Sequence, residues 1–185
     1  KVQYWVFDPT SLYTVTTNLV PFLNSNHPGR LTMAGKALPQ ALSLVNRTVP
    51  LVQTLNSAGK PFVKDMGMVT STNSLVHGTV VEANLKKVVI KDEAGNKHVV
   101  EAVKNLPFNM KGFQDDEALA VKVGDKVTPG QHLYENNYTV GGNLALGKTL
   151  KVAYLPYKGY NHEDGIVMSH SAAASMTSHH AYKVD

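Results

Sequence analysis

The 185-residue chain contains no cysteine, and this absence removes several classes of site at once. Without cysteine there is no disulfide framework, no thiol nucleophile, no iron–sulfur cluster and no cysteine-ligated zinc. No apolar run approaches the ~18 residues of a membrane-spanning helix, and no basic start followed by an apolar stretch marks a secretory signal. The first residue is Lys1 rather than methionine, so we expect a chain that has been trimmed, processed or cut from something longer.

Charge is also scarce, because only 17% of the residues are charged. Basic residues outnumber acidic ones by 18 to 14, which gives a net charge of +4 and a pI of about 9.2. This mild excess is compatible with a phosphate-rich partner and also with an ordinary soluble surface. The 43% of hydrophobic residues exclude a disordered tail and are enough for one good-sized domain or two small ones.

Periodicity predicts one helix, near the start of the chain. Apolar residues recur at a spacing of three and four between Leu31 and Val45, which predicts an amphipathic helix over residues 30–45. Pro39 lies inside this range and is expected to kink or break the helix. Before it, aromatic and β-branched residues predict a strand over residues 3–7, and residues 11–20 are expected to form a second extended piece.

The rest of the chain is typical of short strands separated by turns. The expected strands cover residues 75–83, 86–91, 97–103, 121–133, 150–157, 166–168 and 179–184. The second and third are expected to pair as a hairpin around a turn at 92–96, and the fourth to contain a tight turn at Gly124 and Asp125. The apolar residues 166–168 are expected to be buried on both faces of a sheet.

Strands at this density favour a closed barrel or a sandwich. A linker-like composition near residues 54–59 predicts a domain boundary there. It divides the chain into an N-terminal strand–helix segment, residues 1–55, and a β-barrel region, residues 56–185.

The sequence GYNHED at residues 159–164 is richest in groups suited to chemistry. Glu163 and Asp164 are adjacent, and neighbours in an extended segment point to opposite sides, so only one of them easily faces a given ligand. With Lys158 and His162 beside them, the carboxylates are suited to holding magnesium through water or to ordering an arginine. The alternative interpretation is a polar loop at the end of a strand.

The expected helix offers a second candidate site. Arg30 follows Gly29 at its start, where backbone N–H groups and a guanidinium suit a phosphate. Lys36 and Gln40 lie further along. The alternative interpretation is a core helix whose polar face is merely solvated.

Three other patterns are interpreted as structural or accidental. GNLALGKT at residues 142–149 fits the phosphate-loop pattern literally, but its gap is not glycine-rich and a strand is expected to follow. VGDKVTPG at residues 123–130 resembles a hairpin of lipoyl-type and biotinyl-type carriers, yet no exposed turn offers a lysine for modification. The eight histidines form no HExxH motif, so zinc is not expected.

Taken in order, these segments resemble the β subunit of multisubunit DNA-dependent RNA polymerase. GYNHED at 159–164 resembles that family's GYNFED, GNLALGK at 142–148 its GELALGQ, and VAYLPYK at 152–158 its VAFMPWN. Upstream, PFL at 21–23 and RLTM at 30–33 resemble its proline–phenylalanine and arginine–methionine stretch, with Gln40 in register. Downstream, MTSHH at 176–180 resembles its YTSIH. The resemblance covers almost the whole chain.

The resemblance implies a mainly β fold with one or two helices, built around a double-psi β-barrel-type core that a short N-terminal helical segment precedes. It implies a nucleotidyltransferase that synthesises RNA on a DNA template as one part of an assembly. The implied partners are a β′-type subunit, other polymerase subunits, the DNA template, the RNA–DNA hybrid and nucleoside triphosphates, with no membrane. The implied cofactor is Mg2+, whose main ligands are expected on the β′-type subunit.

The resemblance also assigns roles to residues. Glu163 and Asp164 are expected to be catalytic, with Asp164 near the second Mg2+, directly or through water. Nucleotide and RNA contacts are expected from Arg30, Lys36, Gln40, Asn161 and Lys158.

The chain departs from the family pattern at four positions, Lys36, Pro39, His162 and Gly165, and the family's flap and downstream lysines are absent from it. The chain is therefore expected to be either a fragment of such a β subunit or a divergent polymerase, of bacteriophage type, located in the cytoplasm of a bacterial host or packaged in the virion. The departures also leave two alternatives. One is a non-catalytic barrel that binds nucleic acid or protein and keeps the ancestral fold, and the other is a carrier-like domain.

Overall fold

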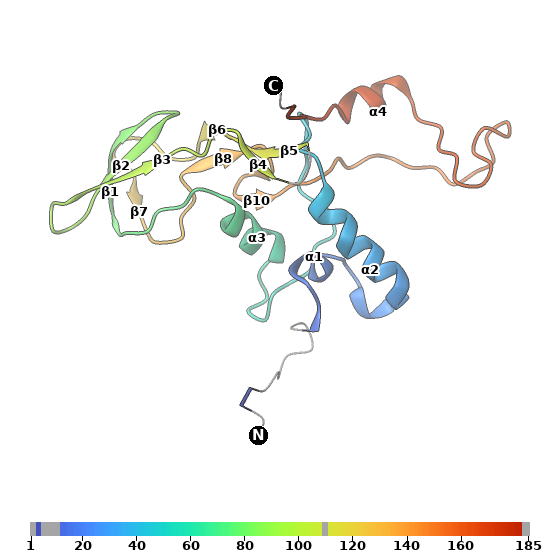
Figure 1. The fold of residues 1–185 in the computed structure, drawn as a ribbon, viewed down its shortest axis with the longest axis horizontal. Helices are drawn as coiled ribbons and strands as arrows, with labels where there is room; N and C mark the ends of the chain where they lie inside the picture. The colour runs from blue at the N-terminus through green and yellow to red at the C-terminus, as the bar shows by residue number, and fades with distance from the viewer. Residues whose placement is uncertain (1–2, 5–11, 109–110, 183–185) are drawn as a thin grey trace.

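A computed structural model of the chain describes residues 3–4, 12–108 and 111–182 (Figure 1). A four-stranded sheet lies at one end of the molecule, helices lie below its centre, and residues 150–176, which we call the arm, extend to the opposite end. The strand expected over residues 3–7 falls largely outside the described residues. No helix of the described part is long and apolar enough to cross a membrane.

Four α-helices occur in the described residues. They are α1 (Val15–Asn18), α2 (Pro28–Ala37), α3 (Phe62–Thr70) and α4 (His170–Ser175), and short 3-10 turns follow at Leu23–Ser25 and Leu38–Gln40. Helix α1 contradicts the extended piece expected over residues 11–20, because the Thr14 hydroxyl accepts a hydrogen bond from the Thr17 N–H and caps a helical turn.

Helix α2 confirms the start of the expected helix and its break at Pro39. His27 accepts a hydrogen bond from the Gly29 N–H, and Pro28 occupies the first turn, where its missing N–H costs nothing. The expected continuation to Val45 is wrong, because the chain becomes extended after Gln40 and Leu44 pairs with Ser178.

Helix α3 was not expected from the sequence. It begins directly after Pro61 and packs against β10 (Asn143–Leu144). At Gly67 the two elements nearly touch, since a Cβ there would lie 2.2 Å from the Gly142 carbonyl oxygen. The absence of a side chain at this position is what allows the close approach.

The main sheet has the order β3-β2-β1-β7, with antiparallel neighbours throughout. Its strands are β1 (Gly78–Ala83), β2 (Lys87–Lys91), β3 (Lys97–Glu101) and β7 (Lys126–Val127). The expected hairpin of β2 and β3 is confirmed, and the Asp92 carboxylate closes its turn by accepting the Asn96 N–H at 2.8 Å. The tight turn at Gly124 is also confirmed, with a φ of +97°.

Six shorter strands form three antiparallel pairs. β4 (Leu106–Phe108) pairs with β5 (Gly112–Gln114), β6 (Asp116–Leu119) with β8 (Tyr134–Asn136), and β9 (Thr139–Val140) with β10. The strand expected over residues 121–133 is reduced to β7 and an isolated bridge between His132 and Asn73.

The hydrophobic core lies on the inner face of the main sheet. Its buried members are Val80, Val88, Ile90, Val121, Val127, Leu133 and Tyr134. Fully burying one such side chain stabilises a fold by about 1.5–3 kcal/mol. The strands and this core confirm a mainly β fold.

Two strands expected in the arm are absent. Residues 150–157 and 166–168 form no strand, and the latter are not buried, since Ile166 is 84% exposed. Their apolar residues satisfy the sequence pattern of a strand, but no other segment of the described chain pairs with them. The strand expected over residues 179–184 is absent from residues 179–182, and residues 183–184 lie outside the described part. The backbone N–H of His179 instead makes a single hydrogen bond to the Ser43 carbonyl at 2.8 Å.

Candidate functional site

The loop that carries GYNHED is organised by its own hydrogen bonds. The Asn161 Oδ1 accepts the Tyr157 N–H at 2.8 Å, and its Nδ2 donates to the Leu155 carbonyl at 2.6 Å. Backbone turns from Tyr160 to Tyr157 and from Gly165 to His162 complete it. The Asn161 amide, expected to contact nucleotide or RNA, therefore shapes the loop within this chain.

Three residues of this loop have left-handed backbone conformations. Lys158 and Glu163 have φ values of +51° and +53°, and Gly159 has +75°. For a residue other than glycine this conformation costs on the order of 1–3 kcal/mol and persists where the surroundings impose it. Strained residues of this kind concentrate at functional sites.

The shape of this loop explains why position 165 is a glycine, where the resembled family has a larger residue. A Cβ at this position would lie 2.9 Å from the Tyr160 carbonyl oxygen and 3.1 Å from that of His162. The loop of this chain is therefore closed too tightly for a side chain at position 165.

The two expected catalytic carboxylates are exposed to solvent. Glu163 lies 3.8 Å from the Nε2 of His162, and both side chains are more than four-fifths exposed. Asp164 is exposed as well. Within the described residues no group of three or more histidine or acidic side chains is suited to hold a metal ion. Asp164 is therefore not part of a three-donor cluster within the described residues.

Helix α2 and the 3-10 turn that follows it carry the second set of expected site residues. The inward face of α2 packs on α1, where the Thr16 hydroxyl donates to the Gly35 carbonyl at 2.8 Å and Leu31 is buried. Arg30, Lys36 and Gln40 are exposed. On α2, Arg30 and Lys36 point away from the buried Leu31 and Gly35. Gln40 lies in the 3-10 turn after the helix.

The two sets of residues do not meet in the described part of the chain. No hydrogen bond or ion pair there joins Arg30, Lys36 or Gln40 to Glu163 or Asp164. Figure 1 shows the GYNHED loop at the far end of the arm, away from α2. The connection between the two sets is made by residues 43–48, which follow the α2 region and contact both ends of the arm.

Both ends of the arm are bound to one short segment, residues 43–48. On the outgoing side the Thr48 N–H donates to the Gly147 carbonyl at 2.8 Å, and the Thr149 N–H donates to the Thr48 hydroxyl at 2.9 Å. On the returning side the Val45 N–H donates to the Thr177 carbonyl at 2.9 Å. We call residues 43–48 the base segment.

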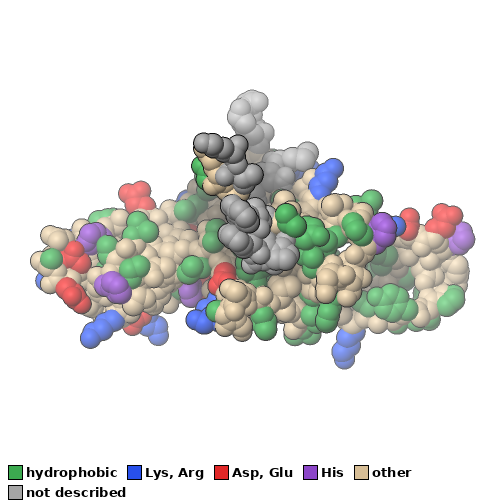
Figure 2. Space-filling view, turned by 90° about the horizontal axis from the view of Figure 1, so that it is seen from below, with side chains coloured by type: hydrophobic (Ala, Val, Ile, Leu, Met, Phe, Trp, Pro, Cys, Tyr) green, Lys and Arg blue, Asp and Glu red, His purple; other side chains and the backbone are tan. Residues whose placement is uncertain are grey.

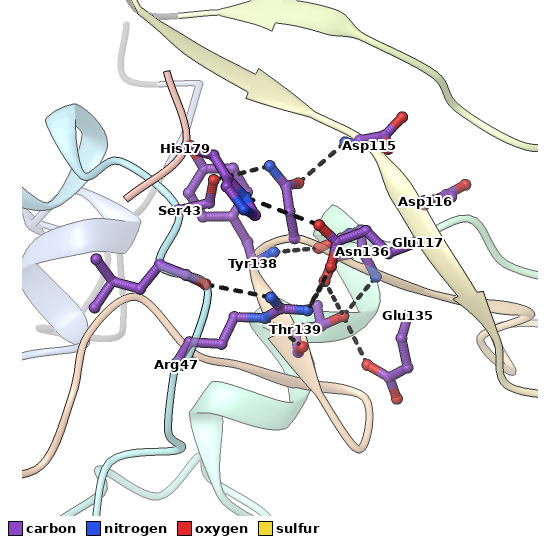
Figure 3. Close-up of polar contacts among 12 residues, drawn as sticks. Ser43, Arg47, Asp115, Asp116, Glu117, Glu135, Asn136, Tyr138, Thr139 and His179 are labelled. Atoms are coloured by element: carbon purple, nitrogen blue, oxygen red, sulfur yellow. Dashed lines mark hydrogen bonds and ion pairs between the residues drawn. The ribbon is translucent and has the colours of Figure 1, made fainter. Parts of the chain in front are cut away.

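Arg47, near the end of the base segment, is the centre of a polar network that sequence reasoning missed (Figure 3). Its Nε donates to the Thr139 carbonyl at 2.9 Å, and its Nη2 donates to the Asn136 carbonyl at 2.7 Å and to Glu117 at 3.1 Å. Its Nη1 donates to the Leu44 carbonyl at 3.3 Å. The Arg47 side chain is only 12% exposed.

Buried amides extend this network beneath the base segment. The Nδ2 of Asn137 donates to the Ser43 hydroxyl at 3.0 Å and to the Phe113 carbonyl at 2.8 Å. Both Asn137 and Ser43 are almost fully buried. No sequence signal marked these residues, because their partners lie far away along the chain and form no motif.

Hydrogen bonding and burial shift the pKa values of two residues near the base segment, Glu135 and Tyr138. A hydrogen bond from His132 lowers the pKa of Glu135, although burial opposes the shift. The Glu135 carboxylate also accepts the Thr139 hydroxyl and the Gly142 N–H. Burial raises the pKa of Tyr138, which keeps its phenol neutral. These groups support the turn between β8 and β10.

The chain is similar to known proteins over most of its length. The family model described as "RNA polymerase Rpb2, domain 6" matches residues 16–184. Proteins named DNA-directed RNA polymerase subunit beta from two strains of Prochlorococcus marinus are each 35% identical over 169 residues, which is 91% of this chain and 15% of the relative. A protein of the same name from a Synechococcus strain is 32% identical over the same shares. The chain thus spans about 15% of the length of these relatives.

Proposed function

The chain belongs to the RNA polymerase Rpb2, domain 6, family, and from this we propose that it serves template-directed RNA synthesis as part of a polymerase β-type subunit. In this proposal the chain is not active alone and contributes contacts to the nucleoside triphosphate and to the RNA 3′ end. Its relatives are named as β subunits of DNA-directed RNA polymerase. The family match is also consistent with the expected barrel-type core.

The observation that carries the proposal is the shape of the arm loop. Asn161 and the left-handed residues hold the GYNHED segment closed, and they leave Glu163 and Asp164 turned to solvent. Nucleotidyl transfer depends on positioning and charge neutralisation more than on a protein nucleophile. Two exposed carboxylates on a loop of fixed shape suit that task once a partner covers them.

Mg2+ enters this proposal as a shared ion. When bound, it would neutralise developing charge on the phosphates and polarise them. Asp164 is the donor that this chain offers, directly or through water, and Glu163 is placed beside it. The main ligands are expected on the β′-type subunit.

The outward face of α2 supplies the basic part of the proposed site. We assign Arg30 to the triphosphate, Gln40 to the RNA end, and Lys36 to a phosphate near them. Lys158 is held close to its own loop, with its Nζ 5.8 Å from the centre of the Tyr157 ring. We assign Lys158, which lies in the same loop as Glu163, to the same phosphates.

Partner subunits are proposed from the exposed apolar side chains of the arm. Tyr154 is 97% exposed, Tyr160 74% and Ile166 84%. Figure 2 shows hydrophobic side chains facing solvent on the half of the molecule that carries the arm. Apolar surface of this kind marks protein interaction sites. A β′-type subunit and other polymerase subunits are the proposed partners, with DNA template and RNA–DNA hybrid bound by the assembly.

Several finer expectations stay predictions. They are the bacteriophage-type origin, the cytoplasmic or virion location, and the division into residues 1–55 and 56–185.

The test is template-directed RNA extension by the reconstituted polymerase that contains this chain. A variant with Glu163→Ala and Asp164→Ala is compared with a charge-matched control, Glu93→Ala with Glu101→Ala, whose side chains are exposed on the distant hairpin. We expect the first variant to lose on the order of 100-fold in extension rate with assembly intact. Equal rates in both variants would instead favour the non-catalytic barrel that binds nucleic acid or protein.

A further inference from the structure

We propose that Arg47 is a positioning residue that fixes the base of the arm, and with it the GYNHED loop, relative to α2. The proposal rests on the proposed function of that loop. It gives a role to a side chain that lies in neither set of expected site residues.

The place of the base segment in the chain is the first argument. Residues 43–48 follow closely after Gln40, the last residue of the turn that ends the α2 helix. The same residues bind the outgoing side of the arm through Thr48 and its returning side through Val45. A six-residue segment therefore sets where the arm starts with respect to the outward face of α2.

The bonds of Arg47 are the second argument. The guanidinium reaches the Asn136 and Thr139 carbonyls near β8 and β9, and Glu117 on β6, while also bonding the Leu44 carbonyl of its own segment. A guanidinium offers five donors in a rigid plane, whereas a lysine ammonium is a point charge on a flexible stem. Only arginine can bind these acceptors together in this geometry.

The carboxylate of Glu117 extends this anchor to the returning side of the arm. One of its oxygens accepts from Arg47, and the other lies 3.9 Å from the Nδ1 of His179 (Figure 3). The His179 N–H is in turn bonded to the Ser43 carbonyl. Arg47 and His179 therefore meet the same anionic group, which joins the two ends of the arm to β6.

Removal of the guanidinium takes one donor from each of three carbonyls and from one carboxylate. The base segment is then free to shift, and both ends of the arm move with it. A displacement of about 1 Å at reacting groups is enough to lower a rate by on the order of 100-fold, even when its origin is remote from the chemistry. Neither Glu163 nor Asp164 is touched by the change.

The first measurement is hydrogen exchange in the assembled polymerase that contains this chain, comparing Arg47→Ala, Arg47→Lys and the exposed control Lys97→Ala. We expect the amides of Val45, Thr48, Thr149 and His179 to exchange about tenfold faster in both Arg47 variants, as the loss of charge-assisted hydrogen bonds predicts. Exchange in the main sheet and in the control should not change. Unchanged exchange at these four amides would overturn the proposal.

The second measurement is a double-mutant cycle on kcat/KM for nucleotide addition, with Asp164→Ala as the other change. We expect Arg47→Lys to lower kcat/KM by about 10- to 100-fold in the wild-type background. In the Asp164→Ala background, Arg47→Lys should lower kcat/KM little further, because the carboxylate that Arg47 helps to position has already been removed. A fully additive loss would show a merely structural role and reject positioning.

The two measurements separate the proposals. If Asp164→Ala leaves kcat/KM unchanged, the proposed function of the loop is wrong, and the exchange of the four amides still decides whether Arg47 fixes the arm. If Asp164→Ala is severe and Arg47→Lys has no effect, the proposed function stands and the positioning role fails.

Discussion

The main sheet and the arm contain the same kinds of apolar residue in opposite surroundings. Ile90 in β2 is fully buried against the core, whereas Ile166 in the arm is 84% exposed. Tyr134 of β8 is fully buried in the same core and donates its hydroxyl to the Asn84 carbonyl, whereas Tyr154 in the arm is 97% exposed. Ile90 and Tyr134 are covered by this chain, whereas Ile166 and Tyr154 lie in the surface that we propose to bind a partner subunit.

The sharpest test of this contrast is the same substitution in both regions. Ile90→Ala should lower the free energy of unfolding of the chain by about 2–5 kcal/mol, because it leaves a cavity in the core. Ile166→Ala should change it by no more than about 0.5 kcal/mol. Urea denaturation of the two variants measures the difference. Equal losses would mean that the arm is packed against its own chain.

Two glycines provide a second, smaller test. Gly67→Ala forces a methyl group towards the Gly142 carbonyl oxygen, so we expect a loss of about 1–3 kcal/mol in the free energy of unfolding. Gly165→Ala crowds the Tyr160 carbonyl in the arm loop and should leave that free energy nearly unchanged.

The effect of Gly165→Ala should appear as a change in loop shape instead. Cleavage by trypsin after Lys158, compared with the wild-type chain, reports it. If Gly165→Ala lowered the free energy of unfolding as much as Gly67→Ala, the arm loop would belong to the cooperative core.

The third test has the smallest expected effect and concerns the turn between β2 and β3. This turn is largely exposed, as the arm is, but hydrogen bonds from Asn96 and His98 to Asp92 hold it together. A hydrogen bond from His98, followed by one from Asn96, lowers the pKa of Asp92 from 3.8 to about 2. A carboxyl group whose pKa is lower in the folded chain than in the unfolded chain stabilises the fold when the pH is above the pKa of the unfolded chain. This contribution is therefore complete above about pH 4 and is lost as the pH falls through about 2.

A carboxyl carbon titration of Asp92 by NMR checks this value. In His98→Ala the pKa of Asp92 should move up towards 3.8, because its main cause has been removed. An unchanged titration in that variant would assign the shift to the side-chain and backbone hydrogen bonds of Asn96 instead.

Local patterns explain what the sequence predicted correctly. The hairpin of β2 and β3 follows from alternating β-branched residues around a turn that Asp92 and Gly95 close within a few positions. The start of α2 and its break at Pro39 also depend on neighbouring residues. In such segments the residues that hydrogen-bond or cap one another lie within a few positions along the chain, so a short stretch of sequence is enough to predict the structure.

Distant partners explain what was missed. Helix α3 depends on the approach of Gly67 to Gly142, and the bonds of Arg47 reach 70 residues to Glu117 and 92 to Thr139. No short window contains both members of these pairs. The strands expected in the arm are wrong for the opposite reason, since their pattern is present and their partner strands are not. The site residues were assigned by resemblance, and their roles stay predictions.

The closeness of the two ends of the arm has a consequence for how its length can vary. Gly147 and Thr177 both bond to the base segment, so the arm leaves and re-enters the core at nearly one place. Adding residues between such ends changes the closure entropy only slowly, since doubling a flexible loop costs about 0.6 kcal/mol. The arm can therefore lengthen or shorten to suit another partner while the sheet keeps its register.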